Sequence, residues 1–317
     1  MDKREFTISA VIPTRNRPKL VVNAVKSVFA QTFPVLEAVV VIDGPDEHTE
    51  QALKAMDDPR IRIVALKENV GGSEARNLGV QAARGNWIGL LDDDDTWLPD
   101  KIAMQVEIAR QVEIPFPVLC SRTICKGPFR DEIIPRELYD CSKPVGDYLF
   151  CRDGLTAYEG SIPTSTIFCP KAIFERVPFL KGLKKHQDWD WVLQVAQHTD
   201  FRIVMLPQAL STFDTAGDRA SVSRVIDWRF SADWARKVRP LLTARAYTHF
   251  LGIFCSYTAS AAGGGLSAQF RLFRQILEGG SLSFDVFARM AFYGLIPDRV
   301  RRGIRRCRSK RTIRETT

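Results

Sequence analysis

Four consecutive aspartates, Asp92, Asp93, Asp94 and Asp95, directly follow a short apolar run at residues 87–91. Adjacent carboxylates repel one another and raise each other's pKa, so a nearby cation is the usual remedy. The apolar run has strand character, and ligands of an open α/β sheet bind outside the carboxyl ends of its strands. If the extended backbone continues, Asp92 and Asp94 point to the same side. The run therefore predicts a site for Mg²⁺ or Mn²⁺ and a diphosphate, or else a solvated acidic turn that caps the next helix.

The segments around the aspartates alternate between strand-like and helical patterns. Strands are expected at 6–12, 38–42, 61–66 and 87–91, and helices at 18–31, 47–56, 74–83 with Ser73 as N-cap, and 100–111. This alternation predicts an α/β fold with a mostly parallel sheet and helices on both faces. Residues 117–170 look like a less regular α+β region, followed by a helix that ends at about residue 198 and a strand at 202–206. Residues 212–224 are polar and turn-rich, so we expect a mobile loop there.

Several common classes of protein are excluded by missing motifs. The first strand is followed by Pro-Thr-Arg-Asn-Arg-Pro and not by a dinucleotide-binding glycine pattern, and no phosphate-binding P-loop motif is present. The seven cysteines include no Cys-x-x-Cys pair, which argues against zinc and fits a reduced, cytoplasmic setting. The first residues lack a signal-peptide pattern, and no apolar run reaches the length of a membrane span.

The positive charge of the chain is concentrated at its C-terminal end. Residues 299–314 contain nine Lys and Arg residues and no acid, so removing them from the net charge of +8 leaves the rest near neutral. Before this tail, the helical region at 226–298 carries apolar stripes, which comprise Leu266, Phe270, Phe273 and Leu277, and then Phe284, Phe287, Ala291 and Leu295. The combination predicts either contact with an anionic membrane surface or a helical bundle with a solvated tail. A nucleic-acid partner is not expected.

Six stretches, in this order and spacing, resemble family 2 of the glycosyltransferases, whose fold is called GT-A. They are residues 11–17, 40–44, 69–79, 83–88, 91–101 and 187–190, and the resemblance covers residues 6–215. The chain departs from the family pattern at Gln187, where Glu is frequent, and at Ile42, where a second Asp is frequent. The resemblance implies a GT-A catalytic domain at 1–225, with a nucleotide-binding half at 1–111 and an acceptor-binding half at 112–225.

The resemblance also implies roles for individual residues. Asp94 would hold Mn²⁺ or Mg²⁺, and Asp92 would bind the ribose or share the water shell of the metal. Asp93 and Asp95 would support these two residues or cap the following helix, with Asp93 counted in the nucleotide-sugar site. Asp43 would recognise the nucleobase, and Pro13, Thr14 and Arg15 would form the loop around it. Arg76 would contact the nucleotide. Asp43 and Arg76 also have purely structural alternatives. Asp43 would then only form the turn into the next helix, and Arg76 would be an ordinary surface residue of its helix.

Asp188 matches the family's catalytic base, which accepts a proton from the acceptor hydroxyl as it attacks. Attack from the face opposite the leaving group inverts the anomeric centre. Asp190 and His186 are rival bases. Trp189 and Trp191 either stack on a sugar or pack the helix.

The expected function is transfer of a sugar from a nucleotide-diphosphate sugar, favoured as UDP-linked, to a glycan or lipid-linked oligosaccharide, as in bacterial surface polysaccharide assembly. Residues 212–224 would close over the donor. The location would be cytoplasmic, with peripheral membrane contact through the basic tail. Two alternatives remain: a nucleotidyltransferase that makes the activated sugar, and a non-catalytic carbohydrate-binding protein.

Overall fold

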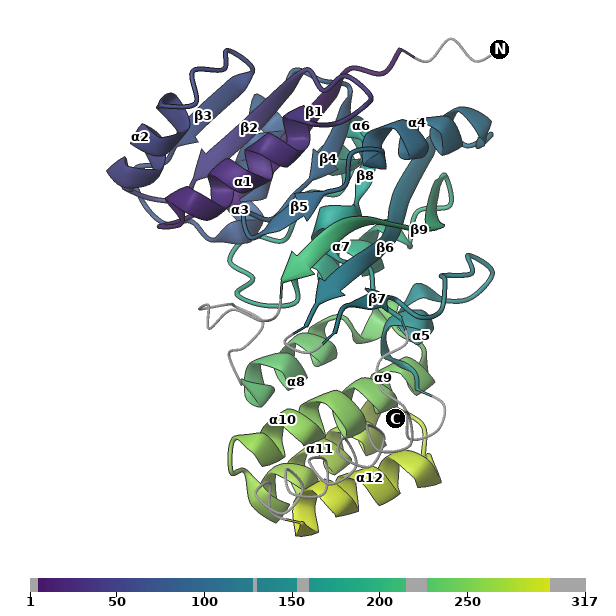
Figure 1. Ribbon diagram of the computed structural model, residues 1–317. Helices are drawn as coiled ribbons and strands as arrows, with labels where there is room; N and C mark the ends of the chain where they lie inside the picture. The colour runs from purple at the N-terminus through teal and green to yellow at the C-terminus, as the bar shows by residue number, and fades with distance from the viewer. Residues whose placement is uncertain (1–4, 128–129, 153–159, 215–226, 297–317) are drawn as a thin grey trace, which may run out of the picture. The chain divides into compact units, whose positions relative to one another are not determined.

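The computed structural model describes residues 5–127, 130–152, 160–214 and 227–296. These residues form two compact units. One contains the described residues before 150 together with residues 160–214, and the other contains residues 150–152 and 227–296. Figure 1 shows a sheet with flanking helices in the first unit and helices in the second. The predicted α/β class with a C-terminal helical region is confirmed.

The first half of the sheet is parallel and deeply buried. Its strands lie in the order β3-β2-β1-β4, and Ile12 of β1 stands beside Val40 of β2. Every residue of β2 is buried, as expected for a strand covered on both faces. The elements of this half are β1 (Ile8–Thr14), α1 (Pro18–Phe29), β2 (Glu37–Ile42), α2 (Glu47–Lys54), β3 (Ile61–Ala65), α3 (Gly72–Ala82) and β4 (Trp87–Leu90).

Helices cover both faces of this half of the sheet. Successive residues of β1 point to opposite faces, so each face packs against a different helix. Ile12 belongs to the same hydrophobic cluster as Val21 and Val25 of α1. Its neighbour Val11 faces α3, where Gly79 lets the helix backbone approach the sheet closely. Parallel pairing of β1 with β2 and with β4 places the carboxyl ends of these strands beside one another (Figure 1).

The second half of the sheet is mixed. Beyond β4 the strands lie in the order β8-β6-β9-β5, with β7 on β6, and among these described strands only β6 and β9 pair in parallel. The elements are β5 (Asp95–Trp97), α4 (Lys101–Gln111), β6 (Phe116–Lys126), β7 (Glu132–Ile134), α5 (Val145–Phe150), a 3₁₀ turn η1 (Thr164–Thr166), β8 (Phe168–Pro170), α6 (Lys171–Arg176), α7 (Gln187–Val195) and β9 (Phe201–Asp214).

The strand expected at 202–206 is present but longer than predicted, and two other expectations about local structure are wrong. The strand expected at 202–206 continues to Asp214, because its second part pairs with both β6 and β5. Residues 212–214, where the expected loop at 212–224 was to begin, therefore belong to this strand, and residues 215–224 lie outside the described residues. Ser73 is not the N-cap of α3: Gly71, with a φ of 86°, occupies that position, and the buried Ser73 hydroxyl has no hydrogen-bond partner.

The second unit is helical, and the predicted apolar stripes do not form its core. The buried positions of α11 include Leu272, Gln275 and Ile276, whereas Leu266 and Phe270 are exposed. Within the described residues, no helix is both long and apolar enough to cross a bilayer. The basic tail at 299–314 lies outside the described residues. The elements are α8 (Trp228–Lys237), η3 (Arg239–Leu241), α9 (Ala244–His249), the π-helical η4 (Phe250–Cys255), α10 (Ser256–Ala261), α11 (Gly265–Gly279) and α12 (Phe284–Leu295).

The close approach of α3 to the sheet predicts that Gly79→Ala destabilises the protein. A Cβ at residue 79 would lie 2.5 Å from Val11 Cγ1 and 3.0 Å from Val41 Cγ2, so the helix must move outward. We expect a loss of about 1–3 kcal/mol in the free energy of unfolding, despite the higher helix propensity of Ala. Urea denaturation measures the loss. Gln81→Ala, on the exposed side of the same helix, is the control, and equal stability of both variants would contradict the packing argument.

Candidate functional site

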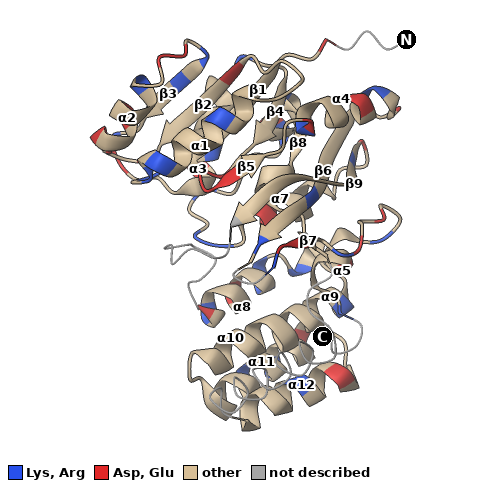
Figure 2. Ribbon diagram, viewed as in Figure 1, with Lys and Arg blue, Asp and Glu red and all other residues tan. Residues whose placement is uncertain are grey.

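The four aspartates lie in a tight turn between β4 and β5, at the carboxyl end of the parallel strands. The turn is closed by the Asp95 N–H, which donates to the Asp92 carbonyl at 3.1 Å. The extended backbone therefore does not continue through the run, yet exposure still alternates: Asp93 and Asp95 are buried, and Asp92 and Asp94 are partly exposed. Two carboxylates are thus available to a ligand, and two are part of the protein interior. Figure 2 shows the acidic residues at the start of β5.

Asp93 ties the turn to the end of β1. The Thr14 hydroxyl donates to one of its oxygens at 2.7 Å, and Arg17 Nη1 donates to the other at 2.8 Å and to Asp94 Oδ2 at 3.2 Å. Burial raises the pKa of Asp93, although the Thr14 hydrogen bond and the Arg17 charge lower it. Arg17 is the last residue of the family-like stretch 11–17, and its pairing with the acidic turn is not predicted by the sequence.

Asp95 anchors the other side of the turn. Its Oδ2 accepts a hydrogen bond of 2.5 Å from the Ser165 hydroxyl, which in turn accepts the Asp92 N–H at 3.0 Å. The second oxygen of Asp95 is buried without a hydrogen-bond partner. Burial, and then the charge of Asp92, raises the pKa of Asp95 well above its usual range. Trp97 holds the same segment, because its indole donates to the Ser165 carbonyl at 3.0 Å.

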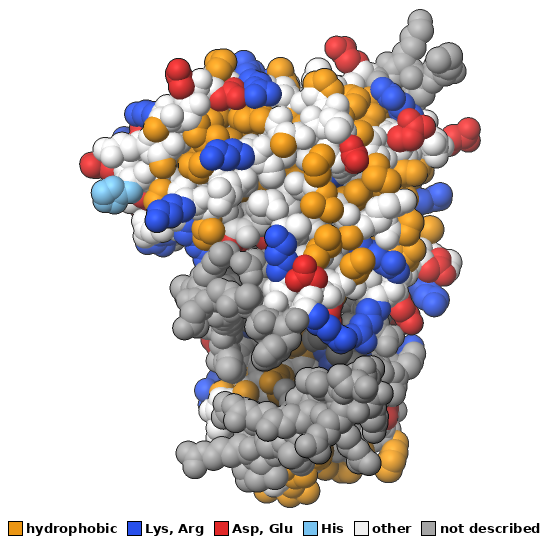
Figure 3. All heavy atoms as spheres, viewed as in Figure 1, with side chains coloured by type: hydrophobic (Ala, Val, Ile, Leu, Met, Phe, Trp, Pro, Cys, Tyr) orange, Lys and Arg blue, Asp and Glu red, His pale blue; other side chains and the backbone are white. Residues whose placement is uncertain are grey.

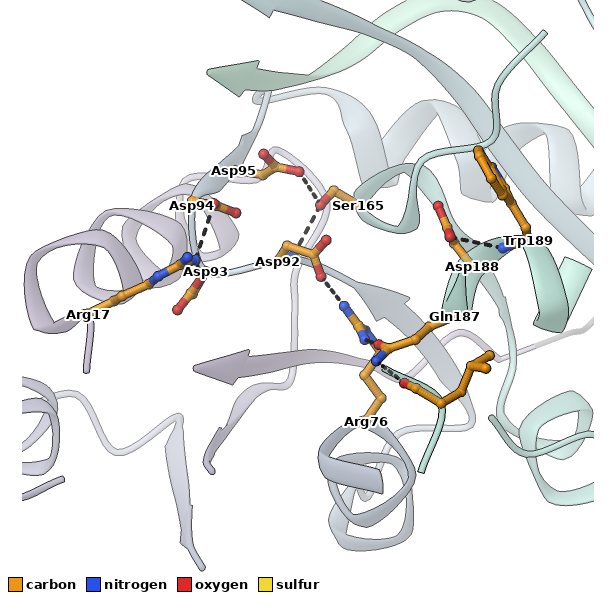
Figure 4. Close-up of polar contacts among 11 residues, drawn as sticks. Arg17, Arg76, Asp92, Asp93, Asp94, Asp95, Ser165, Gln187, Asp188 and Trp189 are labelled. Carbon is orange, nitrogen blue, oxygen red and sulfur yellow. Dashed lines mark hydrogen bonds and ion pairs between the residues drawn. The ribbon is translucent and has the colours of Figure 1, made fainter. Parts of the chain in front are cut away.

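Arg76 connects the acidic turn to α7, as Figure 4 shows. Its guanidinium donates to Asp92 Oδ1 at 2.5 Å and to Gln187 Oε1 at 2.7 Å, and Gln187 donates to the Leu183 carbonyl at 2.7 Å. The Arg76 side chain is only 10% exposed, so the alternative of a surface arginine is wrong. The departure from the family pattern at Gln187 therefore places a neutral amide against this cation.

Asp188 follows Gln187 in the first turn of α7 and is close enough to the acidic turn to respond to its charge. Burial raises the pKa of Asp188, and the charge of Asp92 raises it further, while the Trp189 N–H and the Arg76 charge lower it. The Trp189 N–H donates to Asp188 Oδ1 at 2.9 Å. The structure thus brings together the acidic turn and the predicted base, which are almost a hundred residues apart in the chain.

The rival bases are less available than Asp188. Asp190 is almost fully buried, whereas Asp188 is partly exposed. His186 occupies the N-cap of α7 with a left-handed φ of 65° and stacks on Trp189 with ring centroids 4.7 Å apart. Burial and then the Lys185 charge lower the pKa of His186 to about 3, which makes it a poor proton acceptor.

The two tryptophans of α7 have different surroundings. Trp191 stacks with Phe174 and Phe179 and donates to the Val177 carbonyl at 2.8 Å, so it packs the helix. Trp189 is partly exposed, so stacking on a sugar remains a prediction for Trp189 alone.

The residues predicted to surround the nucleotide base lie at the ends of β1 and β2. Pro13 and Thr14 are the last residues of β1, and Arg15 is exposed just after them. Asp43 follows β2, and its carboxylate accepts hydrogen bonds from the Val70 N–H at 2.7 Å, the Gly71 N–H at 3.0 Å and the Asn69 amide at 3.2 Å. Asp43 therefore holds the loop before α3, and base recognition by Asp43 remains a prediction.

The acidic turn suits a divalent cation that takes one or two carboxylate ligands from the protein and its other ligands from waters and substrate phosphates. Among the described residues, no group of three or more His, Cys, Asp and Glu side chains is arranged to enclose a metal. Mg²⁺ in phosphate-transferring sites is commonly bound by one or two carboxylates, several waters and the substrate phosphates. The partly exposed Asp92 and Asp94 fit that arrangement. Arg17 and Arg76 provide the positive charge that the sequence predicts beside the run, and the metal itself remains a prediction.

The sequence has relatives among proteins of bacterial polysaccharide biosynthesis. The profile of "Glycosyl transferase family 2" matches residues 9–137. The chain is 40% identical to the succinoglycan biosynthesis protein ExoO of Rhizobium meliloti over 32% of its own length and 29% of that protein. It is 23% identical to the amylovoran biosynthesis glycosyltransferase AmsB of Erwinia amylovora over 78% of the chain and 82% of AmsB. It is also 28% identical to the Escherichia coli UDP-Glc:alpha-D-GlcNAc-diphosphoundecaprenol beta-1,3-glucosyltransferase WfgD over 35% of the chain and 44% of WfgD.

Solved structures share the fold at low sequence identity. Staphylococcus aureus TarS in complex with UDP-GlcNAc aligns with a TM-score of 0.55 and 15% identity over 90% of this chain and 79% of that one. The mannosyltransferase PcManGT of Pyrobaculum calidifontis, in complex with GDP-Man and Mn²⁺, aligns with a TM-score of 0.55 and 16% identity over 92% and 86%. These likenesses confirm the predicted GT-A fold.

Proposed function

We propose that this chain, whose residues 9–137 match the model of glycosyl transferase family 2, transfers a sugar from a UDP-linked donor to a hydroxyl group, with inversion at the anomeric carbon. The acceptor is a glycan or a lipid-linked oligosaccharide. One observation carries the proposal: Arg76 joins Asp92 of the acidic turn to Gln187, the neighbour of Asp188. A diphosphate-binding region and a proton acceptor are thereby held in one fixed arrangement.

The names of similar proteins support the choice of donor and acceptor. WfgD is named for UDP-glucose and an acceptor linked to diphosphoundecaprenol, and TarS was solved with UDP-GlcNAc. PcManGT was solved with GDP-mannose, so the fold accommodates either nucleotide. We favour UDP because WfgD, whose name states a UDP-linked donor, is similar to this chain in sequence.

Asp188 is the proton acceptor of the proposed reaction. Asp188 is a partly exposed residue, and its Oδ1 accepts the Trp189 N–H, so that Oδ2 would accept the proton of the acceptor hydroxyl. The oxygen that loses this proton attacks the anomeric carbon while the bond to the diphosphate breaks on the opposite face. A single displacement of this kind inverts the anomeric centre.

The acidic turn and the ends of β1 and β2 would bind the donor. Asp94 and Asp92 would hold Mn²⁺ or Mg²⁺, which supplies positive charge next to the leaving diphosphate. Arg76 would orient Asp92, and Thr14 and Arg17 would fix Asp93 so that the turn keeps its shape. In this assignment residues 1–111 bind the nucleotide, and the acceptor lies against residues 112–225.

The basic tail suggests where the reaction takes place. A lipid-linked acceptor stays at the membrane, and the nine cations at 299–314 would be attracted to anionic lipids on its cytoplasmic face. We therefore expect the protein to act as a peripheral membrane enzyme.

Replacing the proposed base tests the assignment directly. We expect Asp188→Asn to lower the transfer rate by about 10²–10⁴-fold, because the amide cannot accept the proton, while the affinity for the donor is unchanged. The assay follows release of free UDP from UDP-sugars, with Asp200→Asn as a control on the surface of the same unit. Pyrophosphate as product would instead indicate a nucleotidyltransferase, and a normal rate for Asp188→Asn would rule out the base assignment.

The metal assignment predicts a coupling between cation and donor. Mn²⁺ should increase the thermal stabilisation of the protein by UDP, and Asp94→Asn should remove this increase, because ligand binding stabilises the native state in proportion to affinity. The control is Asp58→Asn, since Asp58 pairs with Arg60 away from the acidic turn. This variant should respond like the unmodified protein. Undiminished Mn²⁺ dependence in Asp94→Asn would contradict the assignment.

The environment of Asp188 predicts the acid limb of the pH profile. Burial raises the pKa of Asp188. At a given acidic pH, a larger fraction of Asp188 is therefore protonated, and so inactive as a base, than for a carboxyl with the usual pKa. We expect the single-turnover rate at saturating donor to decline as the pH falls toward this raised pKa, before it reaches about 4, the usual Asp value. A rate that stays constant down to that value would contradict the assignment.

A further inference from the structure

The second unit exposes a wide apolar surface on its last two helices. We call it the α11–α12 apolar face, and it consists of Leu266, Phe270, Leu277, Phe284, Phe287 and Leu295. Phe270 is 71% exposed and Phe284 is 87% exposed. Single exposed apolar side chains are common, but a contiguous set of this kind marks an interaction surface. Hydrophobic side chains are visible at the surface of this unit in Figure 3.

The six side chains form one surface because of helix geometry. The spacings of four and seven residues from Leu266 through Phe270 to Leu277 place these residues on one side of α11. The corresponding stripe of α12 lies beside it, since the rings of Phe273 and Phe287 meet with centroids 5.8 Å apart. The two stripes are therefore continuous.

The buried residues of these two helices are not those of the apolar face. The opposite side of α11 is buried through Leu272 and Ile276, and Gln275 donates to the Ala232 carbonyl and to the Tyr247 hydroxyl, at 2.8 and 3.0 Å. On α12, Val286 and Met290 are the buried residues. Each helix thus packs one side into the core of the unit and exposes a second, apolar side.

The charges around the face favour an anionic partner. Arg271 and Arg274 lie on α11 beside the stripe, and Arg289 lies on α12. Figure 2 shows few other charged residues on these helices. The acids of the two helices are Glu278, which pairs with Arg274, and Asp285. In the sequence, the nine cations at 299–314 follow α12 directly.

We propose that the α11–α12 apolar face inserts its phenylalanine and leucine side chains into the interfacial region of an anionic phospholipid bilayer. Phenylalanine and leucine beside arginine are the composition of helices that lie in the membrane interface. Neither helix is long enough to span a bilayer, so both would lie along its surface. A second copy of the chain is a less suitable partner, because pairing two such faces would bring their arginines together. The proposal is independent of the transfer reaction.

Vesicle binding tests this proposal and separates it from attraction by the tail. The full-length protein is cosedimented with vesicles of phosphatidylglycerol and phosphatidylcholine at low and at high salt. We compare Phe270→Ser/Phe284→Ser with a deletion of residues 299–317. The control is Ile133→Ser/Leu180→Ser, which removes two apolar side chains, each 53% exposed, from the first unit.

We expect the phenylalanine double variant to partition at least about tenfold more weakly at both salt concentrations, since apolar burial is not screened by salt. The tail deletion should weaken binding mainly at low salt, and the control should bind normally. A Phe284→Trp variant should gain fluorescence quenching by lipids with brominated acyl chains, which reports insertion even if the double variant folds poorly.

Three results would overturn the proposal. The first is that the unmodified protein does not bind these vesicles. The second is that the double variant binds as well as the unmodified protein and that the fluorescence of the Phe284→Trp variant is not quenched. The third is that sedimentation velocity shows a dimer which the same two substitutions dissociate without changing vesicle binding, which would make the face a contact between copies.

Discussion

The buried guanidinium of Arg76 is the contact on which the arrangement of the proposed site depends. It extends from α3 and pairs with Asp92 after β4 and with Gln187 at the start of α7, segments 16 and 111 residues away in the chain. A buried cation that loses its partners is strongly destabilising, so these segments are held together by electrostatics as well as by packing. The position of α3 is set in turn by the close contact of Gly79 with the sheet.

The acidic turn divides its four carboxylates between structure and ligand binding. Asp93 and Asp95 point into the protein and hold the turn through Thr14 and Ser165. Asp92 and Asp94 keep part of their surface exposed, each paired with an arginine that limits the repulsion. A chain built in this way can keep the run folded before any ligand arrives. In the proposed reaction the arginines and a divalent cation then act together on the same negative charges.

The second unit shows that the apolar side of a helix need not be its buried side. In α11, the residues that meet the core include Gln269 and Gln275, whose amides are hydrogen-bonded inside the unit. Leu266, Phe270 and Leu277 are on the exposed side. Such an arrangement costs solubility unless something covers the surface, which is why a bilayer interface is a physically reasonable partner.

The amino-acid pattern alone predicts the helices and strands of the parallel half and the chain positions of most proposed site residues. Periodicity sets the helices and strands, and chemically active residues follow the strand ends, so Asp43 and the acidic turn could be located without coordinates. Which charged side chains pair with one another follows from the three-dimensional fold. The pairing of Arg17 with Asp93 and Asp94, and of Arg76 with Gln187, joins residues far apart in the chain, and no local pattern encodes such contacts. The exposed face of α11 was likewise decided by packing, because hydrophobic spacing identifies an apolar side but not what it will contact.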